Sequence, residues 1–133
     1  MNISEFKKVI WEYTRKINEN TNKSFNPIFE EHGLTMLQAR VLMELYYYGS
    51  NSIGNLAEST YVAGANISTI CKRLEKEGLV ERTRNQEDER IVMVVLTEMG
   101  NKSCWILMKS LIKSFQIKSV MNQKKLIKRL LQE

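Results

Sequence analysis

Residues 64–80 read GANISTICKRLEKEGLV, and this stretch decides the fold of the chain. Apolar residues recur in it at the three-and-four spacing of a helix with one buried face, and they are Ile67, Ile70, Cys71 and Leu74. The opposite side is small, polar and basic, and it carries Ala65, Asn66, Ser68, Thr69, Lys72, Arg73 and Lys76. Short polar side chains allow a close approach to bases, and lysine or arginine reaches base edges or phosphates. The pattern predicts a helix that lies in the major groove of DNA, and the alternative is an ordinary solvated face.

The segments on either side complete a winged helix-turn-helix. The predicted elements are a short helix at residues 52–59, a connection at 60–63, the long helix, strands at 79–83 and 91–96, and a polar loop at 84–90. Ser52 is placed to cap the short helix, and Gly78 ends the long one. The predicted fold is therefore mainly α with a small β-hairpin wing.

Apolar stripes near both ends of the chain predict a homodimer. The first helix carries Ile3, Phe6, Ile10, Tyr13 and Ile17, and a helix that Thr97 caps carries Cys104, Trp105, Met108, Leu111, Ile112 and Phe115. Val120 closes that stretch, and Asn122 is expected to cap a last helix. The apolar side of this last helix carries Leu126, Ile127, Leu130 and Leu131. A small winged core cannot bury these stripes, so we expect them to pair with each other and with a second copy. Pro27 leaves two alternatives open, a new helix that Asn26 caps or a kink in one long helix.

These residues resemble the multiple-antibiotic-resistance regulator (MarR) family of bacterial transcription factors. The matching pieces, in chain order, are Gly33-Leu34-Thr35, Gln38, Val41-Leu42, Leu56-Ala57, Arg73-Leu74-Glu75-Lys76-Glu77-Gly78-Leu79-Val80-Glu81-Arg82, Asp88-x-Arg90 and Val94-x-Leu96-Thr97-x-x-Gly100. The resemblance implies a winged helix-turn-helix DNA-binding domain at residues 33–99 and a helical dimerisation region at residues 1–32 and 100–133. In that arrangement the first, fifth and sixth helices of two subunits interleave, and the dimer presents two recognition helices to successive major grooves. The expected partner is double-stranded DNA with an inverted repeat, and the expected role is repression of transcription.

The resemblance also implies which side chains contact DNA. The expected contacts from the recognition helix are Asn66, Ser68, Thr69, Lys72, Arg73 and Lys76, and those from the wing are Arg82, Arg84, Asp88 and Arg90. Arg90 is expected in the minor groove, where the negative potential attracts a guanidinium. Asp88 is expected to pair with an arginine and so to shape the hairpin. Family members commonly carry serine, threonine or arginine where this chain has Ala63, Gly64 and Ala65, so a side-chain cap is lost there.

The net charge of +5 suits a nucleic-acid partner, but the charge is unevenly distributed. Residues 35–99 carry seven cations and nine anions, whereas residues 100–133 carry eight cations and one anion. The cations of the winged segment concentrate where the fold places DNA, and Lys102 is expected to add a phosphate contact. The slight acidity of that segment favours an alternative, a winged-helix protein-interaction module or antirepressor that does not bind DNA itself. Salt dependence separates the two, because phosphate contacts make affinity fall steeply with ionic strength.

The composition bounds the remaining classes of function. The 133 residues fit one domain, and the chain has no apolar run of membrane-spanning length and no signal peptide, so we expect a cytoplasmic protein without a membrane partner. His32 is the only histidine, and the chain has no phosphate-binding loop, nucleophile motif or metal-ligand spacing. We therefore expect neither an enzyme nor a bound cofactor or metal.

Two further features concern sensing. Cys71 and Cys104 lie on predicted apolar faces, where a cysteine packs as a small hydrophobe, and a redox switch is the alternative. Many members of the family that the chain resembles release DNA when a small, often aromatic, anion binds between the dimerisation helices and the winged domain. The aromatic side chains that could reach such a crevice are Trp11, Tyr13, Tyr46 and Trp105. Aromatic residues at helical spacing are more often core, so the sequence identifies no effector pocket.

Overall fold

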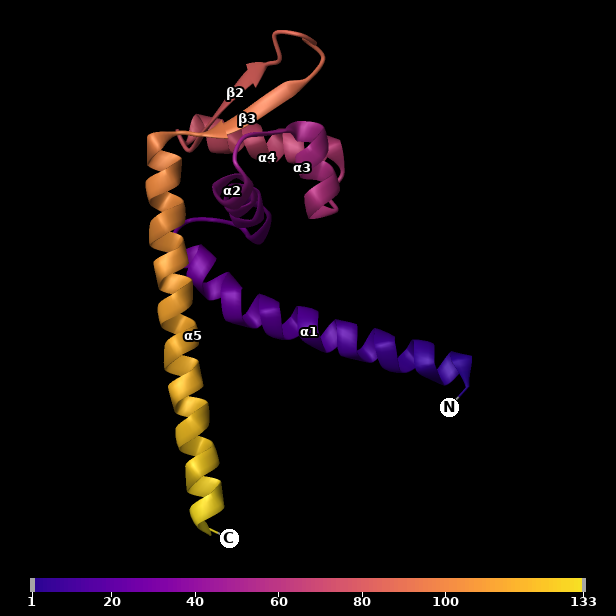
Figure 1. Cartoon of the computed structure of the whole chain (residues 1–133), viewed down its shortest axis with the longest axis vertical. Coiled ribbons are helices and arrows are strands. Elements are labelled where there is room, and N and C mark those ends of the chain that lie inside the picture. The colour runs from indigo at the N-terminus through magenta and orange to yellow at the C-terminus, as the bar shows by residue number, and fades with distance from the viewer. Residues whose placement is uncertain (1, 133) are drawn as a thin grey trace. The chain divides into compact units, whose positions relative to one another are not determined.

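The structure is a computed structural model of the chain, and it describes residues 2–132, without the side chains of residues 21, 115, 118 and 119. Phe115, predicted to lie in an apolar stripe, is thus outside the described side chains. The elements are α1 (Ile3–Glu31), α2 (Met36–Tyr48), β1 (Asn51–Ser52), α3 (Ile53–Thr60), α4 (Gly64–Lys76), β2 (Val80–Arg84), β3 (Val92–Leu96) and α5 (Glu98–Gln132) (Figure 1). The chain divides into two compact units, residues 1–36 and residues 37–133. The predicted grouping of residues 1–32 with residues 100–133 stays a prediction.

The first unit consists mainly of the long helix α1. Asn2 caps it through a capping box, in which its side chain accepts from the Glu5 N–H at 2.8 Å and its own N–H donates to the Glu5 carboxylate at 3.2 Å. The helix continues through Pro27 and ends at Glu31, with His32 as its C-cap. The alternative of a second helix capped by Asn26 is therefore wrong. A proline removes one backbone hydrogen bond, and the turns on either side remain helical.

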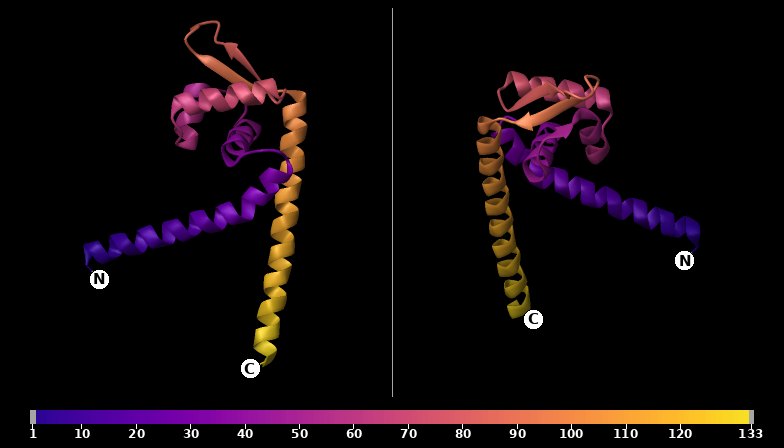
Figure 2. Two further views of the ribbon diagram at one scale, coloured as in Figure 1. Left: turned by 180° about the vertical axis from the view of Figure 1, so that it is seen from behind. Right: turned by 45° about the horizontal axis from the view of Figure 1, so that its top comes forward.

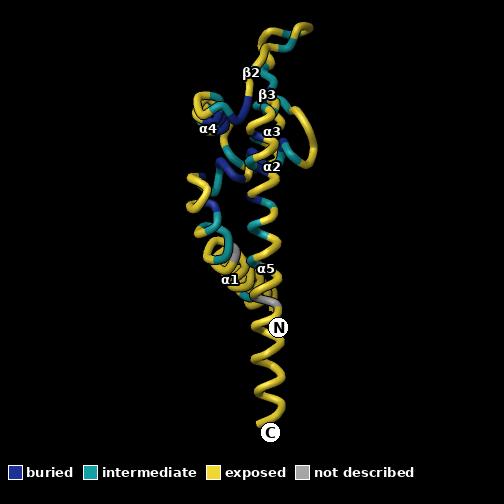
Figure 3. Tube along the Cα trace, turned by 90° about the vertical axis from the view of Figure 1, so that its left-hand side faces the viewer, coloured by how far each residue is buried: buried dark blue, intermediate teal, exposed yellow. Residues whose placement is uncertain are grey.

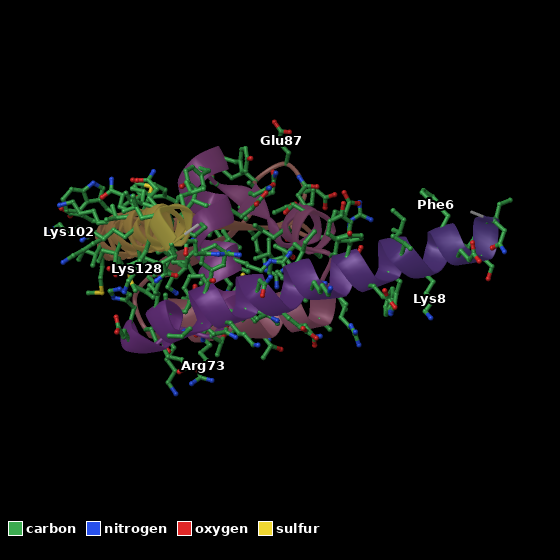
Figure 4. All side chains as sticks on the ribbon, turned by 90° about the horizontal axis from the view of Figure 1, so that it is seen from below. Phe6, Lys8, Arg73, Glu87, Lys102 and Lys128 are labelled. Atoms are coloured by element: carbon green, nitrogen blue, oxygen red, sulfur yellow. The ribbon has the colours of Figure 1, made fainter. Side chains whose placement is uncertain are left out.

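The predicted apolar stripe of α1 lies at the surface of the chain. Its members are each more than half exposed, and they are Ile3, Phe6, Ile10, Tyr13 and Ile17. Phe6 and Lys8 project from opposite sides of the helix (Figure 4). The helix thus has distinct apolar and charged sides, and its apolar row is uncovered within a single chain.

The core of the second unit lies among α2, α3, α4, the first turns of α5 and a small sheet (Figure 3). The side chains that are almost fully buried there are Ala39, Val41, Leu42, Leu45, Leu56, Ile67, Cys71, Leu74, Val80, Val94, Cys104 and Leu107. The sheet is antiparallel with the order β1-β3-β2, and Arg82 and Ser52 face Val94 and Met93 of the central strand. The predicted mainly α fold with a β-hairpin wing is confirmed, and the two-residue strand β1 is an addition to it.

Helix α5 corrects one prediction. It runs unbroken from Glu98 to Gln132, so Val120 does not close a helix and Asn122 does not cap a new one. The chain therefore has five helices within residues 2–132, not the six that the family resemblance implies. Residues 116–125 contain no glycine or proline, and an asparagine inside a helix costs less than about 1 kcal/mol. None of the helices within the described residues is both long and apolar enough to cross a membrane.

The connections of the second unit follow the predicted caps. The Ser52 hydroxyl accepts from the Asn55 N–H at 3.0 Å at the start of α3, and the Thr97 hydroxyl accepts from the Gly100 N–H at 3.0 Å at the start of α5. Gly78, at φ +80°, reverses the chain after α4. The loop joining β2 and β3 projects away from α2 (Figures 1 and 2).

Tyr61, in the connection between α3 and α4, gives a prediction about stability. It adopts the left-handed conformation, with φ 57° and ψ 37°, and its residue surface is 94% exposed. Tyr61→Gly is expected to raise the free energy of unfolding by about 0.5 kcal/mol, because glycine removes the steric cost of that conformation but adds unfolded-state entropy. Urea denaturation measures this change. Tyr61→Ala keeps the strain and is the control, and a glycine variant no more stable than the alanine variant would contradict the explanation.

Candidate nucleic-acid interface

Helix α4 presents one polar, basic side. Its inner residues Ile67, Cys71 and Leu74 are fully buried, and Ile70 is partly buried, which confirms the predicted apolar face. The exposed residues are Ala65, Asn66, Thr69, Lys72, Arg73 and Lys76, and Ser68 is half-buried. Arg73 points outward into open space (Figure 4). The predicted recognition-helix residues therefore lie on one helix, and all of them are exposed except Ser68, which is partly exposed.

The first turn of α4 is open to close approach. Ala63 occupies the N-cap position and makes no side-chain hydrogen bond to the helix. A Cβ atom added to Gly64 would meet nothing within 4 Å. The Thr69 hydroxyl donates to the Ala65 carbonyl at 3.1 Å, which orients this side chain along the helix. Within the part of the chain that the structure describes, the space beside Gly64 is therefore open.

Arg40 of α2 holds the entry to α4, a role that the sequence did not indicate. Its guanidinium donates to the Thr60 carbonyl at 2.8 Å, at the last residue of α3. The Thr60 hydroxyl in turn donates to the Leu56 carbonyl at 2.6 Å. A cation at a helix C-terminus satisfies carbonyl groups that have no partner within the helix. The pair fixes the end of α3 and hence the position at which the recognition helix begins.

The wing loop is held by its own hydrogen bonds. The Asn85 side chain accepts from the Glu87 N–H at 2.8 Å, and the Asn85 N–H donates to the Ile91 carbonyl at 2.8 Å. The Arg84 guanidinium donates to the Glu89 carbonyl at 2.8 Å. Asparagine commonly organises turns in this way. The loop therefore has a defined conformation before any partner binds.

Asp88 pairs with Arg90 at the tip of the wing, so the expected pairing of Asp88 with an arginine is confirmed. Nε of Arg90 donates to one carboxylate oxygen and Nη2 to the other, both at 3.0 Å, and the Arg90 N–H also donates to the carboxylate at 3.1 Å. The Arg90 guanidinium, and then its backbone N–H, hold the pKa of Asp88 below its ordinary value. The Arg90 side chain is 90% exposed. Asp88 thus orients a guanidinium that stays accessible to a partner.

Arg82 lies in a different environment from the other wing arginines. Its Nε and Nη2 donate to Oε1 of Glu75 at 3.2 and 3.0 Å, and its backbone N–H donates to Oε2 at 2.9 Å. The backbone N–H of Arg82, followed by its side chain, holds the pKa of Glu75 below the ordinary value. Only a quarter of the Arg82 side chain is exposed. The sequence did not identify Glu75 as a functional residue. The only signal for the pair is that a glutamate and an arginine lie on either side of the turn at Gly78.

Other cations of the interface make weak ion pairs. Arg73 lies 3.6 Å from Glu77 and Lys102 lies 4.0 Å from Glu98, one helical turn apart in each case, and these side chains are exposed. Exposed pairs of this kind contribute little to stability. Both cations therefore remain free to exchange their carboxylates for phosphates.

The two cysteines are both buried, Cys71 on α4 and Cys104 on α5. Burial raises the pKa of each thiol to about 11, although for Cys71 the Arg82 guanidinium acts in the opposite sense. The Cys104 thiol also contacts the Leu42 carbonyl oxygen at 3.6 Å. A reactive cysteine needs an exposed thiol with a lowered pKa. This geometry favours packing over a redox switch.

The thiols give a prediction about alkaline stability. An unfolded thiol titrates near 9.0, whereas the folded ones titrate near 11. Their contribution to stability is therefore complete below pH 9 and is lost as the pH rises toward 11. At pH 10 we expect a loss of about 1 kcal/mol per thiol relative to pH 8, measured by urea denaturation. The variants Cys71→Ala and Cys104→Ala should each flatten this loss, and an unchanged pH dependence would contradict its assignment to the thiols.

The short helix α3, the helix α4 with its buried face and the β2–β3 hairpin with arginine at its tip together define a winged helix-turn-helix protein. Comparison with known proteins supports a MarR-like regulator. Residues 23–107 match the family described as Transcriptional regulator SarA/Rot. The chain belongs to this family, whose members are transcriptional regulators and not enzymes.

Individual relatives agree with this assignment. The chain is 31% identical over 78 residues to the organic hydroperoxide resistance transcriptional regulator of Bacillus subtilis (strain 168), covering 59% of this chain and 53% of that protein. The chain thus spans about half the length of the curated relatives it matches. The crystal structure of the transcriptional regulator PA4135 matches with a TM-score of 0.76 and 28% identity, covering 89% of this chain and 88% of that one. NadR in complex with 4-hydroxyphenylacetate matches with a TM-score of 0.75 and 28% identity, covering 92% and 89%.

Proposed function

We propose that the protein is a cytoplasmic, sequence-specific DNA-binding repressor that acts as a homodimer on an inverted repeat. The observation that carries this proposal is helix α4, whose inner face is fully buried and whose outer face is polar, basic and open. A helix anchored in this way presents its outer side chains in a fixed orientation, which base readout requires. The exposed guanidinium at the wing tip supplies a second contact in an adjacent groove.

The proposed contacts divide into two kinds. Base edges are read by Asn66, Ser68, Thr69 and Arg73, and phosphates are bound by Lys72, Lys76, Arg84 and Lys102. Arg90 enters the minor groove, and Asp88 orients it. Arg82 leaves the predicted set, because its guanidinium is already bound to Glu75.

The homodimer rests on the uncovered apolar rows of the terminal helices. Besides the α1 stripe, the residues Leu126, Ile127, Leu130 and Leu131 of α5 are each more than half exposed. Exposed apolar rows of this length are typical of interaction surfaces.

Ile10→Glu is expected to convert the dimer to a monomer in analytical ultracentrifugation. Lys8→Glu, which changes charge outside the stripe, is the control and should stay dimeric, and a dimeric Ile10→Glu variant would count against the interface.

A small aromatic anion is the proposed effector class. NadR, a structure with 28% identity, holds 4-hydroxyphenylacetate. A ligand releases DNA only if it binds the DNA-free arrangement more tightly than the bound one. Thermal denaturation in the presence of a series of phenolic acids tests this proposal, and a ligand that raises the midpoint should also weaken DNA binding. If no phenolic acid shifts the midpoint, this effector class is wrong.

The main test is DNA binding at several salt concentrations. Footprinting on DNA upstream of the protein's own gene should reveal a protected inverted repeat, and the logarithm of affinity should fall linearly with the logarithm of salt. A protein-interaction module is the second candidate, since residues 35–99 carry seven cations and nine anions. Absence of protection, or binding that does not depend on salt, would favour that candidate.

A further inference from the structure

We propose that Glu75 and Arg82 form a strut between the recognition helix and the wing, and that they support DNA binding by positioning the wing without contacting DNA. This inference rests on the proposed DNA-binding function. It assigns a role to a glutamate that the sequence did not single out and a different role to an arginine expected to bind DNA.

The strut joins two elements across a sharp turn. Glu75 belongs to the last turn of α4 and Arg82 to the middle of β2, and Gly78 reverses the chain between them. Both carboxylate oxygens are used, one by the guanidinium at 3.0 and 3.2 Å and the other by the Arg82 backbone N–H at 2.9 Å. Bidentate, charge-assisted hydrogen bonds restrict orientation as well as distance. The backbone of β2 is therefore tied directly to the helix.

Because the strut lies far from the tip of the wing, a small change of angle at the strut causes a larger displacement at the tip. Arg82 faces Val94 in the middle of the hairpin, and Val94 is fully buried. The hairpin tip lies roughly 15 Å further on, at about 3.3 Å per strand residue. A tilt of about 10° at the strut would then move the Arg90 guanidinium by about 3 Å. This displacement is larger than the range of donor–acceptor distances over which a hydrogen bond forms. Loss of the strut would misplace Arg90 without any change to Arg90 itself.

Charge supports the same assignment. The Arg82 guanidinium faces a carboxylate and its side chain is mostly covered, so it is poorly placed to reach a phosphate. It also neutralises an acidic residue on the helix that approaches DNA. By contrast, the Arg90 side chain is 90% exposed and the Arg82 side chain is 25% exposed. The two arginines therefore serve different purposes, one within the fold and one at its surface.

Operator titrations at several salt concentrations test the strut. Arg82→Ala and Glu75→Gln should each weaken binding by about ten-fold, equivalent to one good charge-assisted hydrogen bond, and should change the salt slope by the same amount, because both act by displacing Arg90. The double variant should be no weaker than the single ones. If Arg82 instead contacts phosphate, Arg82→Ala lowers the slope by about one and Glu75→Gln leaves binding unchanged or stronger, which would overturn the proposal.

Hydrogen exchange of the wing separates this inference from the proposed function. Amides of β2 and β3 should exchange faster in Arg82→Ala than in the wild type, whether or not DNA binds. Glu81→Gln is the control, because it changes an exposed charged side chain of the same strand that takes no part in the strut. Equal exchange in Arg82→Ala and Glu81→Gln would refute the strut. A wild-type protein that binds no DNA would refute the proposed function, while faster exchange in Arg82→Ala would still support the strut.

Discussion

Replacing Gly100 by alanine is expected to destabilise the second unit by about 3 kcal/mol or more, the upper range for forcing atoms into a packed site. A Cβ at this position would overlap the Leu79 carbonyl oxygen and lie 3.0 Å from its carbon. The same carbonyl accepts from the Thr97 N–H at 3.1 Å, and the Thr97 hydroxyl donates to the Gly78 carbonyl at 2.6 Å. The start of α5 thus docks on the turn after α4, and the obstacle is backbone, which cannot rotate aside.

Urea denaturation followed by circular dichroism measures the effect of Gly100→Ala. Gly64→Ala is the matched control, because a Cβ there meets nothing within 4 Å. Alanine favours a helix over glycine by about 1 kcal/mol in a helix interior and by less near its end, so the control should be neutral or slightly stabilising. Similar stability of the two variants would show that α5 does not pack on Leu79 as described.

Arg90→Ala is expected to weaken binding to the operator by about ten-fold or more and to lower the salt slope by about one. The physical reason is that the Arg90 guanidinium, oriented by Asp88, is exposed at the wing tip, where it can enter a narrow groove of negative potential. The fold should be unaffected, because the Arg90 side chain is exposed and is not part of the core. Fluorescence anisotropy with a labelled operator measures the affinity.

Arg90→Lys separates charge from shape at the wing tip. Lysine keeps the positive charge but loses the planar group that binds Asp88 through two nitrogen atoms. Its affinity should fall between the wild type and the alanine variant, while its salt slope stays that of the wild type. An alanine variant that binds the operator as tightly as the wild type would exclude Arg90 from the interface.

The recognition helix was predictable because its signal is local. Ile67, Cys71 and Leu74 repeat within eight residues, and the same residues are fully buried. The wing tip was also predictable in part, since Asp88 and Arg90 are two residues apart and form their pair within one loop. Their contacts with DNA stay predictions, as do those of α4.

Local sequence signals did not decide the structure where the same residues allow two local structures. Asn122 suits a helix cap and also tolerates a helix interior, and the structure has one continuous helix there. Pro27 left two alternatives open, and the structure shows that α1 continues through it. For Asn122 the free-energy difference between a cap and a helix interior is small, so the local sequence does not choose between them.

The sequence by itself determined the buried face of α4, the caps at Ser52 and Thr97 and the turn at Gly78, because each depends on residues within about one helical turn. Only the tertiary structure decided that Ser52 pairs with Met93, that Arg82 binds Glu75, and that Gly100 lies against Leu79. These contacts join separate elements, and whether such residues meet depends on how the core packs.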